Sequence, residues 1–184
     1  GSDHIDGGTG DDTINAGSEG DELFGQDGDD TLNGEGGRDT IYGGADNDTI
    51  NGGADVDRIY GGDGDDTING GLGFDRLYGG DGADTFVFED ISDSAGRLYD
   101  LVYDFDQGEG DILNLSDMLG GYDSLTDDIN DFVSFYASRG DVVLFVDADG
   151  AGGERHTSVA KLYGNAALDG IDVQTLVDAG QVII

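Results

Sequence analysis

An aspartate recurs at every ninth position through the first half of the chain. Residues 7–87 align as nine consecutive nonapeptides, and the end of another one precedes them. The sixth position of the repeat is always aspartate: Asp3, Asp12, Asp21, Asp30, Asp39, Asp48, Asp57, Asp66, Asp75 and Asp84. The eighth position is always large and apolar, from Ile5 to Phe86. A unit this short cannot bury an apolar face alone, so successive units are expected to stack into a solenoid.

The ninth position shows how many repeats make one coil of this solenoid. It alternates between asparagine (Asn15, Asn33, Asn51, Asn69) and an aromatic residue (Phe24, Tyr42, Tyr60, Tyr78), so like residues are 18 apart. Each repeat joins a Gly-rich half, suited to tight turns, to a short strand with one inward side chain. The sequence therefore predicts an all-β-dominated fold, a right-handed parallel β-roll whose two thin sheets lie back to back. Stacked Tyr rings and Asn ladders would stabilise its in-register strands.

In such a coil the aspartates would form a column along each edge. Asp12, Asp30, Asp48, Asp66 and Asp84 would lie on one edge, and Asp3, Asp21, Asp39, Asp57 and Asp75 on the other. At a strand spacing of about 4.8 Å, neighbouring carboxylates would repel each other by roughly 3.5 kcal/mol. Burying one apolar side chain per repeat does not offset this repulsion and the entropy of ordering nine residues. We therefore expect the repeats to be disordered until a cation neutralises them.

Calcium is the cation that these residues favour. Ca²⁺ accepts six to eight oxygen ligands in irregular geometry, whereas Mg²⁺ demands a tighter octahedron and Zn²⁺ prefers nitrogen or sulfur ligands. The chain has no cysteine and only two histidines. The predicted ligands are the ten aspartates together with turn carbonyls such as those of Gly10, Gly28, Gly37, Gly44, Gly62, Gly64, Gly73 and Gly82. Four gaps on each edge predict about eight calcium ions.

The composition excludes several other classes of function. The chain has 42 acidic residues against 7 Lys plus Arg, a formal net charge of −35, which argues against nucleic-acid or anionic-lipid partners. The sequence contains no run of 18 apolar residues, so we do not expect direct membrane insertion. The protease and lipase motifs H-E-x-x-H and G-x-S-x-G do not occur, so we do not expect an enzyme.

Beyond about residue 88 the nine-residue register is lost, and the sequence predicts two regions, residues 1–87 as the β-roll and 88–184 as a mixed β/α cap. Ser116 is a candidate N-cap, and Ser124 to Asp127 forms a candidate capping box before apolar residues at helical spacing. Residues 141–164 suggest a hairpin, residues 172–180 a helix, and the last four residues a strand. The cap would cover the open end of the solenoid.

The nonapeptide GGxGxDxUx, where U is apolar, resembles the repeats-in-toxin (RTX) motif, also called the haemolysin-type calcium-binding repeat. The resemblance implies that each ion lies between successive coils, held by two stacked Asp side chains and by carbonyls of the Gly-rich turns. Six positions depart from the pattern: Glu19, Asp46 and Asp55 at the fourth position, Ala16 at the first, and Gln26 and Glu35 at the second. Those turns are expected to bind calcium more weakly or to recruit an extra carboxylate.

The last hundred residues resemble the C-terminal target domain of bacterial proteins exported by type I secretion, especially large biofilm and surface adhesins. The segments that carry this likeness are DLVYDFDQGEGDILNLSDML, DVVLFVDADG and the closing LYG to VII region. The resemblance implies an export signal at the extreme C-terminus, the type I secretion machinery as partner and an extracellular or cell-surface location. It also implies a further ion at Asp104, Asp106 and Asp111.

Two alternatives remain open at this stage. The Thr and Asn columns or the Tyr ladder could form a calcium-rigidified surface that binds ice, a glycan or a cell, although β propensity explains these residues equally well. The chain could instead be the tail of a secreted enzyme. The first residue is not methionine, so we expect the chain to be a piece of a larger protein. A host or biofilm surface ligand would then be bound through that parent protein.

Overall fold

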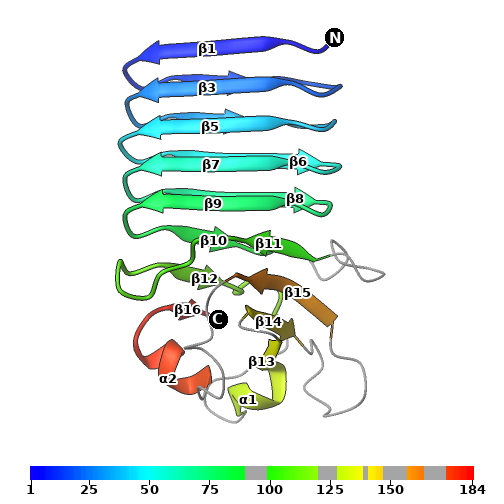
Figure 1. Ribbon diagram of the computed structural model, residues 1–184, viewed down its shortest axis with the longest axis vertical. Coiled ribbons are helices and arrows are strands. Elements are labelled where there is room, and N and C mark those ends of the chain that lie inside the picture. Colours follow the sequence, from blue (N-terminus) through cyan, green and yellow to red (C-terminus); the bar gives the residue numbers. More distant parts are fainter. Residues whose placement is uncertain (90–98, 120–127, 139–140, 147–156, 164–172) are drawn as a thin grey trace.

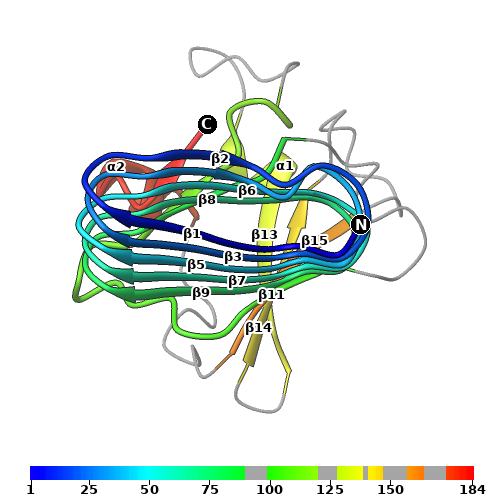
Figure 2. The ribbon, with the colours of Figure 1, turned by 90° about the horizontal axis from the view of Figure 1, so that it is seen from above.

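The computed structural model describes residues 1–89, 99–119, 128–138, 141–146, 157–163 and 173–184. The repeats wind into a stack of flattened coils, with the N-terminus at one end and the mixed C-terminal elements at the other (Figure 1). Seen along the stack, two sheets lie face to face and turns join them at both edges (Figure 2). The predicted parallel β-roll is therefore confirmed.

Within the repeats, from β1 to β10, odd-numbered and even-numbered strands belong to different sheets. The first sheet contains β1 (His4–Thr9), β3 (Glu22–Asp27), β5 (Thr40–Ala45), β7 (Arg58–Asp63) and β9 (Arg76–Asp81). The second contains β2 (Thr13–Asn15), β4 (Thr31–Asn33), β6 (Thr49–Ala54), β8 (Thr67–Leu72) and β10 (Thr85–Val87). Neighbouring strands are parallel, and each residue lies opposite the residue 18 positions later, as in the pair Tyr42 and Tyr60. The coil of two repeats is confirmed.

The eighth-position residues form the core between the two sheets. From Leu23 to Phe86 they are at most 1% exposed, because each strand turns this one side chain inward. The seventh and ninth positions point outward and carry the ladders. Ring centroids in the series Phe24, Tyr42, Tyr60 and Tyr78 are 4.7 to 4.9 Å apart. The Asn33 side-chain amide donates a 3.0 Å hydrogen bond to Asn15 Oδ1. These contacts stabilise the in-register stacking of the strands.

Both sheets continue beyond residue 87, where the sequence placed the end of the roll. In the first sheet, β11 (Asp100–Val102) pairs with β9, and β15 (Thr157–Leu162) then pairs with β11. In the second sheet, β12 (Ile112–Asn114) pairs with β10, and β16 (Val182–Ile183) pairs with β12. All four pairings are parallel. The C-terminal half thus contributes strands to the roll as well as covering its end.

The remaining elements form the cap. Strand β14 (Asp141–Val146) pairs antiparallel with β15, which confirms the hairpin predicted within residues 141–164, and β13 (Val133–Ser138) pairs antiparallel with β14. Helix α2 (Val173–Asp178) confirms the predicted C-terminal helix, while α1 (Ile129–Phe132) starts after Asp128, whose side chain accepts from Asn130 N–H. Ser116 begins a turn and not a helix, and the candidate box at Ser124 lies outside the described residues. No helix in the described ranges is long and apolar enough to cross a membrane.

Candidate calcium-binding edges

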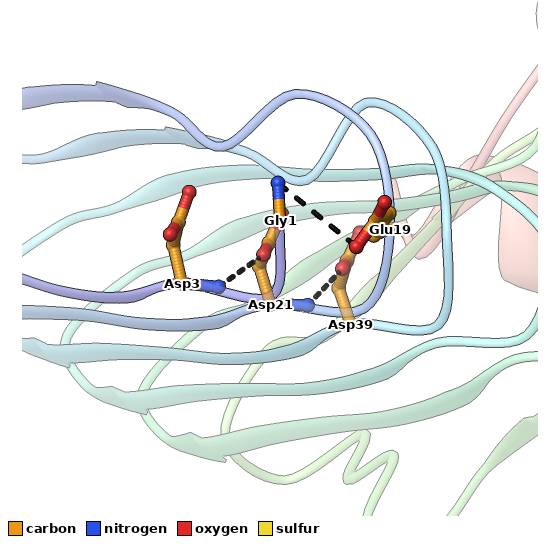
Figure 3. Close-up of polar contacts among 5 residues, drawn as sticks. All are labelled: Gly1, Asp3, Glu19, Asp21 and Asp39. Carbon is orange, nitrogen blue, oxygen red and sulfur yellow. Dashed lines mark hydrogen bonds and ion pairs between the residues drawn. The ribbon is translucent and has the colours of Figure 1, made fainter.

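Each sixth-position aspartate is joined to its equivalent in the next coil. The backbone N–H of Asp3 donates a 2.7 Å hydrogen bond to Asp21 Oδ1, and that of Asp21 donates one of the same length to Asp39 Oδ1 (Figure 3). The same bond repeats along both edges, with lengths of 2.7 to 3.0 Å. The ten predicted aspartates therefore lie in the two predicted columns. One carboxylate oxygen of each acceptor is used by the backbone.

The second carboxylate oxygen has no such partner. Eight Oδ2 atoms are buried without a hydrogen bond from any described group, and they belong to Asp21, Asp30, Asp39, Asp48, Asp57, Asp66, Asp75 and Asp84. A buried charged oxygen without a partner costs several kcal/mol, so native proteins pair such atoms or bind a cation with them. Eight equivalent cases on two edges indicate a ligand that both edges require.

The electrostatics of the columns lead to the same conclusion. The pKa of Asp57 and of Asp66 is raised to about 7, chiefly by burial and also by neighbouring carboxylates, against the lowering effect of their backbone hydrogen bonds. Burial likewise raises the pKa of Asp48 and of Asp84 to about 6. These carboxylates lose water without gaining an opposite charge. A bound cation would supply that charge.

Glycine at the first position, which every repeat except that of Ala16 has, leaves room beside the carboxylate. A Cβ atom on Gly43 would lie less than 3.0 Å from both Asp48 Oδ2 and the Gly61 carbonyl oxygen of the next coil. The same two kinds of oxygen approach the first glycine of other repeats, namely Gly25, Gly34, Gly52 and Gly61. A carboxylate and a carbonyl of adjacent coils thus face one point. The sequence prediction missed these first-position carbonyls, and the repeated glycine was their only signal.

The predicted turn carbonyls stack along the same edges. The Gly44 carbonyl lies against Gly62, and the Gly64 carbonyl lies against Gly82, so equivalent carbonyls of successive coils follow one another. The Gly10 carbonyl is placed in the same way beside Gly28. Gly37 and Gly73 instead lie against carbonyls of Glu19 and Asp55, two of the residues that depart from the repeat. All eight predicted glycines therefore belong to these stacked turns.

Five departures from the repeat have left-handed backbone conformations. Glu19, Asp46 and Asp55 at the fourth position and Gln26 and Glu35 at the second have φ between 69° and 82°. Glycines at most equivalent positions also have positive φ, and only glycine adopts it without strain. The turn conformation is therefore kept where the glycine is lost. Gln26 finds a partner, because its side-chain amide donates to Asp6 Oδ1.

The C-terminal half completes both columns. Asp75 N–H donates to Asp100 Oδ1 at 2.9 Å, and Asp84 N–H donates to Asp111 Oδ1 at 3.0 Å. Asp111 was predicted, but Asp100 was missed. Its signal is the segment Asp-Leu-Val-Tyr at residues 100–103, which matches the sixth to ninth positions of a repeat.

The two other predicted cap aspartates lie nearby. Asp104 Oδ1 accepts from Gly79 N–H at 2.9 Å, and its charge adds to the effect of burial in raising the pKa of Asp84. Asp106 differs, because its exposed Oδ1 accepts from Gly108 N–H and closes a local turn. Its backbone N–H donates to Asp111 Oδ2. The structure therefore brings Asp104 and Asp111 to the end of one column, with the Asp106 side chain turned to its own loop.

These donors fit a hard divalent cation. Among the described residues, no three acidic or histidine side chains form a metal-binding cluster. The carboxylates instead follow one another singly along each edge, with carbonyl oxygens between coils. Ca²⁺ is the ion that accepts such a mixture of carboxylate and carbonyl oxygens.

Comparisons with known proteins place this geometry in a family. The family model for the RTX calcium-binding nonapeptide repeat matches residues 1–23, 24–59 and 60–90. Among solved structures, the AlgE6R2 subunit of an Azotobacter vinelandii mannuronan C5-epimerase is similar at 29% identity, over 93% of this chain and 94% of that chain, with a TM-score of 0.49. The AlgE6R3 subunit gives 21% identity, coverages of 100% and 80%, and a TM-score of 0.34.

The extracellular lipase LipA of Serratia marcescens is similar at 19% identity, over 95% of this chain but 38% of the lipase, with a TM-score of 0.38. No curated protein sequence matches. The family assignment therefore rests on the repeat match together with the two aspartate columns. Residues 1–90 belong to the family of RTX calcium-binding nonapeptide repeats.

Proposed function

We propose that Ca²⁺ ions bind between successive coils on both edges and that their binding drives the chain to fold. The observation that carries this proposal is the set of eight buried Oδ2 atoms without a described hydrogen-bond partner. Each ion would be held by sixth-position carboxylates of adjacent coils and by carbonyls at the first, second and fourth positions of the turns. When bound, calcium supplies positive charge that offsets the repulsion within each column.

The number of ions follows from the number of carboxylates in each column. Ten aspartates give four gaps on each edge, or about eight ions. Asp100 and Asp111 add one further gap to each edge, because they occupy the next places in the columns. We therefore propose about ten sites by this geometry, two of which join the roll to the C-terminal half.

Calcium-dependent folding suits an exported protein. Ions that bind only the folded coil raise the free energy of unfolding as free calcium rises. In a calcium-poor cytosol the acidic chain would stay unfolded and could pass through a type I secretion channel, whereas calcium outside the cell would fold it. The chain would then serve as the secretion and folding module of a larger extracellular bacterial protein, for which we propose a biofilm or surface adhesin. The cap would provide a folding nucleus.

The folding proposal is tested by far-UV circular dichroism of the chain, first stripped of metal with a chelator and then titrated with calcium. We expect a cooperative gain of β signal with calcium and no comparable gain with magnesium. A fully folded signal in chelator would contradict the proposal, because the ion-free columns would then be stable without a counter-charge.

Export is tested separately by deleting residues 165–184 from a secreted fusion protein. The deletion removes α2 and β16, and with them the proposed signal. We expect secretion to fall sharply while the fusion still accumulates in the cell. Undiminished secretion would mean that the signal lies elsewhere, and it would leave the calcium proposal intact.

A further inference from the structure

A hollow of about 450 Å³ lies on the outer side of the first sheet, over three successive coils. Its lining includes three arginines, Arg38, Arg58 and Arg76, and two apolar residues, Val56 and Phe74. The Arg76 guanidinium lies 5.9 Å from the centre of the Phe74 ring. Asp39, Asp57 and Thr40 complete the lining, so arginines outnumber carboxylates by three to two beside an apolar wall, on a chain whose formal net charge is −35.

Calcium binding does not require these residues. On the opposite edge the fifth position carries mainly Asp or Asn, whose side chains continue a hydrogen-bonded ladder from Asp11 to Asp65. On the edge of the hollow the same position carries Arg38, Val56 and Phe74 in consecutive coils. The sixth and eighth positions of these coils keep the repeat. The arginines and apolar residues of the hollow thus occupy fifth and seventh positions, which vary from coil to coil, beside the column aspartates Asp39 and Asp57.

The arginines have no ion-pair partner among the described acidic residues. Arg58 and Arg76 lie directly opposite each other in the parallel register of β7 and β9, which places two like charges side by side. Lys161, in contrast, forms a 2.8 Å ion pair with Asp141. Of the seven Lys and Arg residues, three therefore line one hollow without a described counter-ion.

Neutralising the aspartate column is the simplest alternative role for these arginines. Asp39 and Asp57 also line the hollow, so the distance would permit it. However, no ion pair joins any of the three arginines to either carboxylate in the described part of the chain. The arginines therefore remain available to another anion.

We propose that this hollow binds a saccharide that carries an isolated carboxylate group. Guanidinium groups bind carboxylates through paired hydrogen bonds, and the volume of the hollow suits a unit of one or two sugars. Phe74 and Val56 would contact the apolar C–H face of the sugar, and Thr40, which also lines the hollow, would offer its hydroxyl to those of the sugar. The negative field of the whole chain disfavours a polyanion, so the acidic group is expected singly on an otherwise neutral glycan. The site needs the folded roll, however folding is triggered.

The probe is methyl β-D-glucuronide, added to the calcium-saturated full chain while the arginine Nε–Hε signals are followed by NMR. We expect saturable shifts of three arginine signals. Methyl β-D-glucoside, which lacks the carboxylate, and inorganic sulfate, which lacks the apolar face, should each bind at least about tenfold more weakly. Equal binding of the glucuronide and either of these two probes would overturn the proposal.

Variants separate binding from folding. Arg58→Gln and Arg76→Gln should each weaken glucuronide binding at least about tenfold. Thr67→Gln, at the equivalent outward position of the other sheet, should leave it unchanged. All three should keep the wild-type calcium midpoint, measured by circular dichroism. The saccharide proposal would be contradicted if the wild-type protein folds but does not bind the glucuronide, or if the arginine variants bind it normally. Neither result would affect the calcium proposal.

Discussion

The backbone N–H of Asp75 donates a 2.9 Å hydrogen bond to Oδ1 of Asp100, which lies 25 residues later in the chain. Elsewhere on this edge the equivalent bond joins residues 18 apart. Asp100 is only 6% exposed and occupies the place of the next sixth-position aspartate. The C-terminal half is therefore tied to the roll by the same contact that joins one coil to another.

Replacing Asp100 tests this tie. Asp100→Asn keeps an oxygen that can accept the Asp75 N–H but removes the charge that we propose for calcium. We expect the calcium midpoint for folding to rise severalfold, by about tenfold if one ligand charge is worth about 1.4 kcal/mol. Circular dichroism titration measures the midpoint. Asp117→Asn changes the same charge at an exposed position and should have no effect; a midpoint equal for all three proteins would contradict the assignment.

The room beside the first glycine is tested by Gly43→Ala. The added Cβ would lie less than 3.0 Å from Asp48 Oδ2 and from the Gly61 carbonyl. We expect the free energy of unfolding in calcium to fall by about 1 to 3 kcal/mol, the usual cost of overpacking. Urea unfolding at fixed free calcium measures the loss. Gly36→Ala is the matched control, since nothing lies within 4 Å of a Cβ there. An equal loss of unfolding free energy for both substitutions would contradict the close approach of these two oxygens to Gly43.

The ion-free chain should become more stable on mild acidification. Burial raises the pKa of Asp57 and Asp66 from the ordinary 3.8 to about 7. Between these values the folded state binds more protons than the unfolded state, so the free energy of unfolding falls as pH rises from about 4 to about 7. We expect β signal in chelator to grow between pH 7 and pH 5. Substituting both aspartates by Asn should flatten this dependence, and a signal that falls on acidification would contradict it.

Protons and calcium should compete for the same oxygens. The raised pKa values predict that the calcium midpoint falls as pH rises through about 6 to 7, where Asp48, Asp57, Asp66 and Asp84 lose their protons. Titrations at pH 5.5, 6.5 and 7.5, with free calcium measured at each pH, test this expectation. A midpoint independent of pH would mean that ionic ligands other than these carboxylates determine the affinity.

Glu35 tests the strain in the turns. Its φ of 69° is one that glycine adopts freely and a side chain does not. Glu35→Gly should therefore raise the free energy of unfolding by about 0.5 to 1 kcal/mol, after the entropy that glycine adds to the unfolded chain is subtracted. Glu35→Gln removes the charge but keeps the strain, so it separates the two effects. Stabilisation by Glu35→Gln equal to that by Glu35→Gly would assign the gain to charge.

Much of the roll could be predicted because each coil repeats the same physical demands. An inward apolar residue, an edge aspartate and an alternating ninth residue determine the strand, the column and the period, as Tyr42, Tyr60 and Tyr78 show. Asp100 was missed because the residues before it interrupt the nine-residue count, although its own segment still matches the repeat.

Other features depend on neighbours that no local pattern specifies. The order of strands in the cap, with β15 between β11 and β14, comes from pairings between distant segments. The first-position carbonyls are backbone atoms, so the sequence marks them only by the glycine beside them. The arginine hollow needs side chains from three coils at once. The first-position carbonyls and the hollow follow from the coil once the register is known, whereas the order of strands in the cap does not.

The alternation of Asn and aromatic residues also restricts how such a gene segment can change length. Gain or loss of 18 residues would keep every Asn beside an Asn and every ring beside a ring. Asn51 now lies opposite Asn69 in this way, and Tyr60 opposite Tyr42. A change of nine residues would preserve the aspartate columns but set amides against rings on both sheets. Duplication or loss by unequal recombination is therefore expected to conserve the fold only in whole coils, which makes the length of the roll adjustable in steps of one coil.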